Sequence, residues 1–582
     1  MRSILSFLLA AGSLVSAAPG LGFPKRAPVL VPRSNSSSSP SLPSSACSGN
    51  TPSTRSEWCQ YSIDTDYATE YVDTGVTREY WLELTDVVVA PDGIKRPAMA
   101  VNGSIPGPTL YADWGDTVTV HVKNSLTHSL NGTSIHWHGI RQNHTYENDG
   151  TSAVSQCPLV PGETQTYTWK AEQYGTSWYH SHFVLQAWQG VFGGLVINGP
   201  ASANYDEDLG VLFLNDWSHQ TVDELHHWAA VHGPPTSDTG LINGTNIWVA
   251  EDNVTTTGER FKLKFESGKS YRLRLVGAAI DSHFKFSIDN HTMTVISADL
   301  VPVEPFVTDT IQVGMGQRYD VVIKADQADL CDNFWLRAVP QSDCSQNHHG
   351  DNVKGIVYYG DEPSTPETYP HDTETTCEDN TSDLIPVVPH QVDHADWTDV
   401  ESASVSNQSL GLFKWYLNST TMVLDWKKPT IKQVLDGVAD YEKDDAIFEI
   451  YGVDQWVYFI IETDLPIPHP IHLHGHDFYV LAQGSGEYTE HTPLDLTNPP
   501  RRDTALLPGP GHLVMAWKTD NPGAWLLHCH IGWHMSEGFA VQFLEREDEL
   551  EQISNKEMID DQCATWSAFQ DEQGIHQWDS GI

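Results

Sequence analysis

The chain has 582 residues, enough for three or four domains that each bury a core of their own. Its 77 acidic and 32 basic residues give a formal net charge of −45, which keeps a protein soluble and repels nucleic acid and anionic lipid. This charge argues against nucleic-acid and membrane partners, and no segment beyond the N-terminus is apolar for the roughly 18 residues that a membrane span requires.

The N-terminus has the layout of a cleavable secretory signal. Arg2 precedes an apolar run that begins at Ile4, and small residues follow at 16–18. The Ser/Pro-rich stretch that comes next has the composition of a pro-segment rather than of a folded element. We therefore expect a signal peptide at 1–18, a pro-segment at 19–44, and a secreted, extracellular protein.

Glycosylation motifs agree with secretion, because the Asn of an Asn-x-Ser/Thr sequon must be exposed to be modified. A single sequon would have little weight, but this chain has many. They begin at Asn102, Asn131, Asn143, Asn243, Asn253, Asn290, Asn380, Asn407 and Asn418.

A threefold internal repeat organises the rest of the chain. Each copy opens with a Gly turn and a stretch of alternating apolar and polar residues, which is the pattern of a half-buried strand. A second turn and strand follow, and each copy then reaches a strand with aromatic residues. The first units lie at 115–122, 268–275 and 452–460, the second at 161–167, 315–321 and 510–516, and the aromatic strands at 177–182, 333–337 and 524–530. Short strands with regular Gly/Pro turns predict three all-β sandwich domains, at 45–200, 201–365 and 366–582.

Histidine clusters occur in the first and third copies of the repeat, whereas the second copy has the strands without them. Residues i and i+2 of a strand face the same side, so each His-x-His pair can offer two imidazoles to one site. Eight imidazoles are expected to face a common cluster. They belong to His136, His138, His180, His182, His472, His474, His528 and His530.

Cys529 lies between two of these histidines and is predicted to be a metal thiolate. A thiolate with two imidazoles, here Cys529 with His469 and His534, is the ligand set of a blue-copper electron-transfer site. Because Cys529 points to the opposite face from its neighbours, a few covalent bonds would connect this copper to the imidazole cluster. Eight cysteines suggest four disulfides, but a metal-bound Cys529 leaves one of the other seven free.

Zinc is the main alternative metal for these clusters. Structural zinc sites close with four ligands, far fewer than the chain offers, and zinc has no redox role. The isolated pairs His226–His227 and His348–His349 have no partner cluster and are not predicted to bind metal. The Gly314-x-Gly316 motif lacks a third Gly and a following helix, so it is interpreted as a turn rather than a nucleotide site.

The first motif carries a family resemblance. His136-Trp-His-Gly139 is followed by Asp149-Gly150 and then by Gln156-Cys-Pro158, with a spacing that resembles the multicopper oxidases and, most closely, the laccases of ascomycete fungi. The resemblance covers nearly everything after Cys47. It implies three cupredoxin-like Greek-key sandwiches and four copper ions, with ligands from domains 1 and 3 and a substrate-pocket wall from domain 2.

The resemblance also implies a role for each ligand. His476 matches a position that is not a ligand. The type 2 copper would be held by His136 and His472, one type 3 copper by His138, His180 and His530, the other by His182, His474 and His528, and the type 1 copper by His469, Cys529 and His534.

Two further residues are placed beside the coppers by the same resemblance. The axial type 1 position falls on Phe539, an apolar non-ligand typical of laccases with a high potential, and not on the nearer Met535. Asp149 matches an acid that supplies protons near the cluster. An ordinary turn Asp before Gly150 is the alternative for that residue.

The resemblance implies the disulfides and a role for the C-terminus as well. The pairs would be Cys47–Cys59, Cys157–Cys563 and Cys344–Cys377, which leaves Cys331 unpaired. The last four residues, 579–582, are similar to the terminus on which ascomycete laccases end and which plugs a channel to the cluster.

The function that this resemblance implies is that of a laccase, with one-electron oxidation of phenols or aromatic amines at the type 1 copper and reduction of O2 to water at the other three. The resemblance places the acceptor of the phenolic proton at about Glu259, with Asp238 as the second candidate. A monomer is expected. A ferroxidase is the nearest enzymatic alternative, and a copper-storage assembly is the alternative of another class; the natural substrate is left open.

Overall fold

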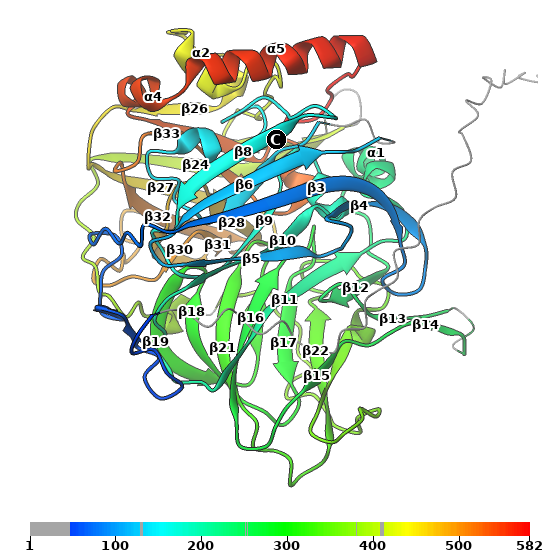
Figure 1. Cartoon of the computed structure of the whole chain (residues 1–582). Helices are drawn as coiled ribbons and strands as arrows, with labels where there is room; N and C mark the ends of the chain where they lie inside the picture. The colour runs from blue at the N-terminus through cyan, green and yellow to red at the C-terminus, as the bar shows by residue number, and fades with distance from the viewer. Residues whose placement is uncertain (1–46, 128–131, 251, 253, 380, 408–411) are drawn as a thin grey trace, which may run out of the picture.

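The computed structural model describes residues 47–582 except 128–131, 251, 253, 380 and 408–411 (Figure 1). The expected signal peptide (1–18), the pro-segment (19–44) and the sequon residues Asn131, Asn253 and Asn380 lie outside the described residues. The Asn of five other sequons is exposed, as glycosylation requires: Asn102, Asn143, Asn243, Asn290 and Asn418.

Three two-sheet β-sandwiches follow one another along the chain. In the first, one sheet has the order β4 (Arg96–Val101), β3 (Thr77–Val89), β6 (Thr117–Asn124), β8 (Thr164–Lys170), and the other β5 (Gly107–Asp113), β10 (Phe192–Asn198), β9 (Gly175–Ser181), β7 (Ile135–His138). Apolar side chains from both sheets, including Leu82, Val120 and Trp137, form one buried core between them.

The second sandwich lies below the first in Figure 1, at the end of the molecule away from helix α5 (Lys556–Gln573). One sheet has the order β12 (Thr239–Ile242), β11 (Glu207–Trp217), β16 (Ser270–Gly277), β21 (Arg318–Lys324), β18 (Met293–Ala298), β19 (Val301–Thr308). The other has the order β15 (Lys262–Lys264), β23 (Lys354–Tyr358), β22 (Asn333–Pro340), β17 (Phe284–Ile288), β20 (Ile311–Val313).

The third sandwich carries the Cys529 strand. One sheet has the order β25 (Phe413–Leu417), β24 (Trp397–Asn407), β27 (Trp456–Thr463), β32 (Gly511–Lys518), β29 (Phe478–Ser485), β30 (Arg501–Arg502). The other has the order β26 (Ile447–Ile450), β34 (Ala540–Glu545), β33 (Gly523–Cys529), β28 (His469–Leu473), β31 (Thr504–Leu507). One apolar core is continuous across the second and third sandwiches.

The repeat seen in the sequence recurs in the strand pairing. Each sandwich has one parallel pair in each of its sheets: β3 with β6 and β5 with β10, β11 with β16 and β15 with β23, β24 with β27 and β26 with β34. Sandwiches whose parallel pairs occupy matching places share one topology, as the repeat predicts. Domain boundaries at 200/201 and 365/366 remain a proposal, compatible with strands that end at Asn198 and Tyr358.

The helices lie outside the sandwiches and were not predicted from the sequence. Helix α5 (Lys556–Gln573) lies beside α2 (Thr430–Leu435) and α4 (Glu547–Ile553) in Figure 1. Helix α1 (Val222–His232) begins with a capping box formed by Thr221 and Glu224. Helix α3 (Gly532–Ser536) follows β33 directly and carries His534.

Short elements complete the fold. The strand pairs are β1 (Glu57–Trp58) with β2 (Tyr61–Ser62) and β13 (Ile247–Val249) with β14 (Thr256–Gly258). The 3-10 helices are η1 (Tyr146–Asn148), η2 (Gln186–Gln189), η3 (Gly350–Asn352), η4 (Thr381–Asp383) and η5 (Lys443–Asp445).

The structure contains the disulfides that the family resemblance implies: Cys47–Cys59, Cys157–Cys563 and Cys344–Cys377. The second of them joins the first domain to helix α5, across 406 positions of sequence. Cys331 is a free thiol whose Sγ lies 3.2 Å from the carbonyl oxygen of Asn333. The other free cysteine of the described residues is Cys529, which is buried.

Candidate metal centre

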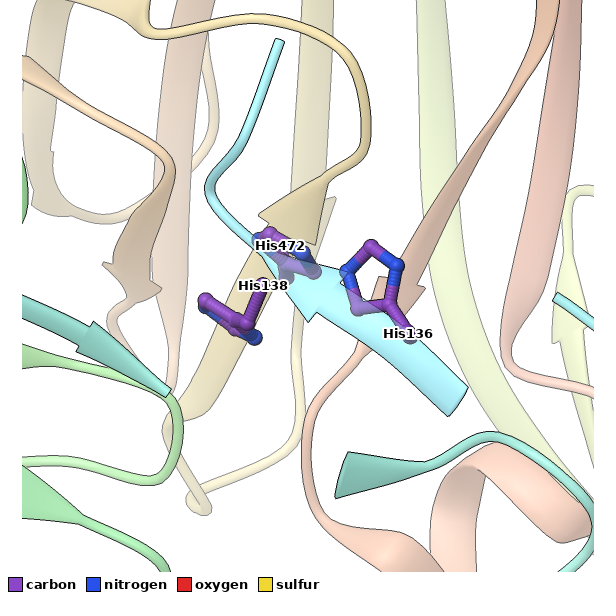
Figure 2. A group of neighbouring side chains, drawn as sticks. All are labelled: His136, His138 and His472. Carbon is purple, nitrogen blue, oxygen red and sulfur yellow. The ribbon is translucent and has the colours of Figure 1, made fainter. Parts of the chain in front are cut away.

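The predicted ligands gather into four buried groups, and within each group the candidate ligand atoms lie within 4.8 Å of one another. Figure 2 shows one of the groups, in which His136 and His138 from β7 face His472 from β28. The groups are His136, His138 and His472; His138, His180 and His530; His182, His474 and His528; and His469, Cys529 and His534.

Neighbouring strands bring the imidazoles together by their register. His136 lies opposite His180 in the pairing of β7 with β9, and His472 lies opposite His528 in the pairing of β28 with β33. Each His-x-His pair projects from one face of its strand, as the period of two requires. The first and third domains therefore each supply four imidazoles to one cluster between them.

The two halves of the cluster meet through stacked rings. The ring of His138 stacks on that of His472 at 3.8 Å between centroids, and the ring of His136 stacks on that of His474 at 3.9 Å. Each stacked pair joins one imidazole of domain 1 to one of domain 3. The cluster is complete only when the two domains are docked.

Hydrogen bonds leave one nitrogen of each of these rings for a metal. The Nδ1 atom of His136 bonds to the carbonyl oxygen of Asp149 at 2.9 Å, and Nδ1 of His472 bonds to that of Asp503 at 2.7 Å. Nδ1 of His474 bonds to a carboxylate oxygen of Asp149 at 2.9 Å. The Nε2 atoms of all three are buried without a protein partner, which is the arrangement of histidine ligands held by an outer acceptor.

His138 has the opposite orientation. Its Nε2 atom lies 3.2 Å from a carboxylate oxygen of Asp503 and 3.2 Å from the hydroxyl of Thr504, and its Nδ1 is the buried nitrogen without a partner. Asp503 was not among the residues predicted from the sequence. Its available signal was the charged run Arg501-Arg502-Asp503 in a segment that becomes fully buried.

Burial and neighbouring charges favour the neutral form of several cluster histidines. Burial, followed by repulsion from neighbouring imidazoles, holds the pKa of His182, His472 and His474 well below the ordinary value of 6.5. Burial likewise lowers the pKa of His528 to about 4. Neutral imidazole is the form that binds metal. These imidazoles can therefore bind copper ions without first releasing a proton.

The fourth group is built around a thiol. Sγ of Cys529 lies 3.8 Å from Nδ1 of His469 and 3.7 Å from Nδ1 of His534. Burial raises the pKa of the Cys529 thiol, so copper must displace a proton when it binds there. Thiolate and two imidazoles fit the blue-copper donor set.

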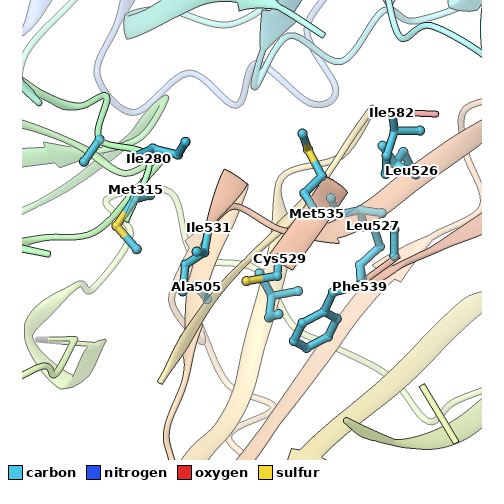
Figure 3. Packing of buried hydrophobic residues seen from close by; sticks show 14 of the residues in the cluster. Ile280, Met315, Ala505, Leu526, Leu527, Cys529, Ile531, Met535, Phe539 and Ile582 are labelled. Carbon is cyan, nitrogen blue, oxygen red and sulfur yellow. The ribbon is translucent and has the colours of Figure 1, made fainter. Parts of the chain in front are cut away.

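Aromatic side chains close this group on one side. Phe539 is fully buried, and its ring centroid lies 5.1 Å from that of His469; Figure 3 shows it in the same apolar cluster as Cys529 and Met535. Trp415 stacks on Phe539 at 5.0 Å and lies 4.2 Å from the ring of His534. Trp415 was not predicted, because its strand β25 carries no motif.

The two expected proton acceptors lie in different surroundings. The side chain of Asp238 is 30% exposed, and one of its oxygens accepts the backbone N–H of His219 at 2.8 Å. Glu259 is exposed beyond β14, and its backbone bonds to Asn246 and Thr245.

A chain of contacts leads from Asp238 toward helix α3. The N–H of Asp238 donates to the carbonyl of Trp217 at 3.1 Å, and the guanidinium of Arg96 covers the Trp217 ring at 3.6 Å. Arg96 donates to the carbonyl of Trp188 at 3.3 Å, and the ring of Trp188 lies against Gly532. These contacts connect Asp238 to the helix that carries His534, and Glu259 joins the same region through Asn246, which donates to Thr239.

The C-terminus is part of the folded structure. Ser580 donates from its N–H to the carbonyl of Ser536 and from its hydroxyl to the carbonyl of Met535, both at 2.9 Å. Ile582 is fully buried. Terminal residues are ordered only when such contacts hold them, so residues 579–582 are docked against α3.

Comparisons with known proteins agree with this site. Three multicopper oxidase family models match residues 83–202, 208–361 and 418–549. The chain is 44% identical to Laccase-2 of Botryotinia fuckeliana over 575 residues, which cover 96% of this chain and 98% of that protein, and 40% identical to a laccase of Neurospora crassa over 92% of this chain and 89% of that one. The chain belongs to the multicopper oxidase family.

Solved structures agree in fold. The crystal structure of the laccase from Botrytis aclada has a TM-score of 0.87 at 44% identity and covers 92% of this chain and 99% of that one. The iron-import multicopper oxidase Fet3p has a TM-score of 0.76 at 23% identity, with 86% of this chain and 96% of that one covered, and thus shares the fold. The three sandwiches are cupredoxin-like domains, and the cofactor is a set of four copper ions, as the sequence predicted.

The docking of the C-terminal residues 579–582 should weaken as pH rises. Burial raises the pKa of Asp579 to about 6, despite the nearby Lys414, so the docked segment binds this proton more tightly than the released one does. Docking is then fully favoured below the unfolded pKa of about 3.9 and loses this contribution as pH rises through about 6. Amide exchange of Leu424, whose N–H donates to Ser580, should report the loss after correction for intrinsic rates.

Asp579→Asn should remove this pH dependence, whereas the exposed Glu572→Gln should retain it as the matched control. An unchanged profile in Asp579→Asn would assign the effect to another group, such as Glu537, whose pKa burial raises to about 8.

Proposed function

We propose that this protein is a secreted, monomeric laccase that oxidises phenols or aromatic amines one electron at a time and reduces O2 to water. The observation that carries the proposal is the position of Cys529. Its Sγ lies in one metal group, while the imidazoles of His528 and His530 lie in two others. When bound, the coppers supply one-electron acceptance at the Cys529 group and four-electron delivery to O2 at the cluster.

We assign the ligands by applying the roles that the family resemblance implies to the four groups that the structure brings together. His136 and His472 would hold the type 2 copper, His138, His180 and His530 one type 3 copper, His182, His474 and His528 the other, and His469, Cys529 and His534 the type 1 copper.

The backbone of residues 528–530 provides the path between the two centres. The path runs from Sγ of Cys529 along the backbone to the neighbouring residues His528 and His530 and ends at their imidazoles. All three residues are buried. Burial keeps water from the path and holds its atoms in one geometry, so that little reorganisation accompanies electron transfer. Four electrons are needed for each O2, which is why a one-electron site is coupled to a three-copper cluster.

Asp149 is the residue that we assign to proton delivery at the cluster. One carboxylate oxygen accepts hydrogen bonds from Nδ1 of His474 at 2.9 Å and from the hydroxyl of Thr151 at 2.7 Å. Its other oxygen is buried without a hydrogen-bond partner among the described residues and lies 3.3 Å from Nδ1 of His136. An ordinary turn Asp would instead be solvated.

The rival activities differ in substrate. Fet3p, named for a role in iron import, shares only the fold at 23% identity, so it gives no direct support to a ferroxidase activity. Among the described residues no helix is long and apolar enough to cross a membrane. The high negative charge agrees with small uncharged substrates rather than nucleic acid or membrane partners.

The decisive test is oxygen consumption with a methoxyphenol, compared with ferrous iron and ascorbate. The wild-type protein should be blue and should turn over the phenol fastest. Cys529→Ser should lose the blue band and phenol oxidation, because the serine hydroxyl does not replace the thiolate, while cluster copper is retained. Faster turnover of ferrous iron would overturn the laccase assignment, and a Cys529→Ser variant that stays blue would overturn the type 1 assignment.

Phe539→Met should lower the potential of the type 1 copper. A buried phenyl ring cannot donate to the metal, whereas a thioether can and would stabilise the oxidised form. Redox titration should show the fall, with about a tenfold change in a one-electron equilibrium for each 59 mV. Electron-poor phenols should slow more than electron-rich ones. Met535→Leu is the matched control, and a shift in that variant with none in Phe539→Met would make Met535 the axial residue.

A carboxylate near the type 1 group accepts the phenolic proton in this proposal. Asp238→Asn should lower kcat/KM for phenols about 100-fold, the usual scale for a lost general base, and leave oxidation of a substrate without an ionisable proton, such as ferrocyanide, unaffected. Glu259→Gln, measured in parallel, separates the two candidates. A selective loss in Glu259→Gln, with none in Asp238→Asn, would make Glu259 the proton acceptor instead.

A further inference from the structure

Domain 2 contributes no imidazole to the four groups among the described residues, yet it places a cation beside them. Arg318, the first residue of β21, is fully buried. Its two terminal nitrogens donate to the two carboxylate oxygens of Asp503, each at 2.5 Å. Its remaining donors reach the carbonyls of Thr176 at 3.2 Å and Gly316 at 3.1 Å.

Asp503 in turn contacts both sides of the cluster. One carboxylate oxygen lies 3.2 Å from Nε2 of His138, from domain 1, and its main-chain carbonyl accepts Nδ1 of His472, from domain 3, at 2.7 Å. The same carboxylate oxygen accepts the hydroxyl of Thr504 at 3.0 Å. Asp503 therefore connects a cation of domain 2 to ligands of the other two domains.

The orientation of His138 depends on this carboxylate. In His136, His472 and His474 the outer nitrogen is Nδ1, but in His138 it is Nε2, and Nδ1 faces the cluster. Which nitrogen of a histidine ligand faces the metal is set by the hydrogen bond that the other nitrogen makes. A lone carboxylate can rotate about its χ angles, whereas the two parallel bonds of a guanidinium fix its plane.

The backbone leaves little space around these contacts. A Cβ on Gly316 would come within 2.9 Å of Cδ2 of His530 and 3.1 Å of Cε1 of His138. A Cβ on Gly139 would collide with Asp503 and Arg318, and Gly139 has a φ of +74°. Both glycines let the strand of domain 2 and the motif of domain 1 approach the pair closely.

We propose that Arg318 is a positioning residue for the trinuclear copper centre: by holding the Asp503 carboxylate in one plane, it makes His138 present Nδ1 to the metal. The inference rests on the ligand assignment proposed above. It gives the domain without ligands a specific task, which is to complete the outer support of a site between its two neighbours.

The test is the ratio of total copper, measured by elemental analysis, to type 1 copper, measured by the blue band, in the holoenzyme, because His138 is assigned to a type 3 copper. Arg318→Met should keep the blue type 1 copper and lower the affinity of the cluster for copper about 10- to 100-fold, the usual effect of removing an outer support. Arg318→Lys keeps the charge but not the two parallel bonds, and should give the same selective loss, smaller in size.

The ratio is independent of how much protein folds, because a merely structural defect lowers both signals together. Arg337 is the matched control, since it also makes two bonds to a buried carboxylate in domain 2, at 2.7 and 2.8 Å to Asp289, away from the cluster. Arg337→Lys should keep the wild-type ratio. Wild-type ratios in Arg318→Met and Arg318→Lys, or an equal selective loss in Arg337→Lys, would overturn the proposal.

These outcomes are distinct from a failure of the proposed function, in which the wild-type protein itself would lack the blue type 1 copper or the copper of the cluster. Asp503→Asn provides a second route: combined with Arg318→Met it should add little to the loss caused by either change alone, because both remove the same contact. Fully additive losses would show that Arg318 does not act on the cluster through Asp503, and would overturn the proposed role of Asp503 as the link between Arg318 and His138.

Discussion

The alternation of side chains along β33 is the constraint on which the rest of the site depends. Because Cys529 faces one way and its neighbours the other, the thiolate site and the imidazole cluster must lie on opposite faces of a single strand. No change in loops can alter their separation without breaking that strand. The third domain therefore contains one metal group entirely, whereas the cluster has to be completed by a second domain packed against the opposite face.

The cluster forms only where domains 1 and 3 meet, so copper binding depends on the contact between these domains. Stacked imidazoles join domain 1 to domain 3, and the Cys157–Cys563 disulfide links domain 1 to helix α5 of domain 3. The buried pair of Arg318 and Asp503 connects domain 2 to domain 3. Breaking a buried ion pair on one side leaves an uncompensated charge, which is far more costly than losing an exposed pair. These contacts therefore favour one arrangement of the three domains.

Much of this site could be predicted from sequence because it is local in the chain. The His-x-His pairs, Cys529 and the turn-strand repeat need only a period of two to be interpreted, and the structure brings these residues together as expected. The sandwiches could be predicted for the same reason. Helix α5 was missed because its apolar positions are few: its buried face consists of Ile559, Cys563 and Trp566, and the disulfide of Cys563 adds to this anchoring. The residues missed at the site act across long separations: Asp503 meets His138 across 365 positions, and Arg318 meets Asp503 across 185. A buried Arg or Asp has no local pattern, since its position becomes favourable only once its partner is in place.

The hydrogen bonds around the cluster orient the metal-binding nitrogens before any metal is bound. His136, His472 and His474 each have one nitrogen bonded to a backbone or carboxylate oxygen, so their rings are oriented by the protein alone. The other nitrogen is buried without a protein partner, and such an unsatisfied polar atom costs about 1–3 kcal/mol. Packing of three domains and the outer hydrogen bonds must offset that cost. Copper that binds to these nitrogens stabilises the folded state. The outer hydrogen-bond partners, including Arg318, therefore stabilise the copper-bound state more than the copper-free state.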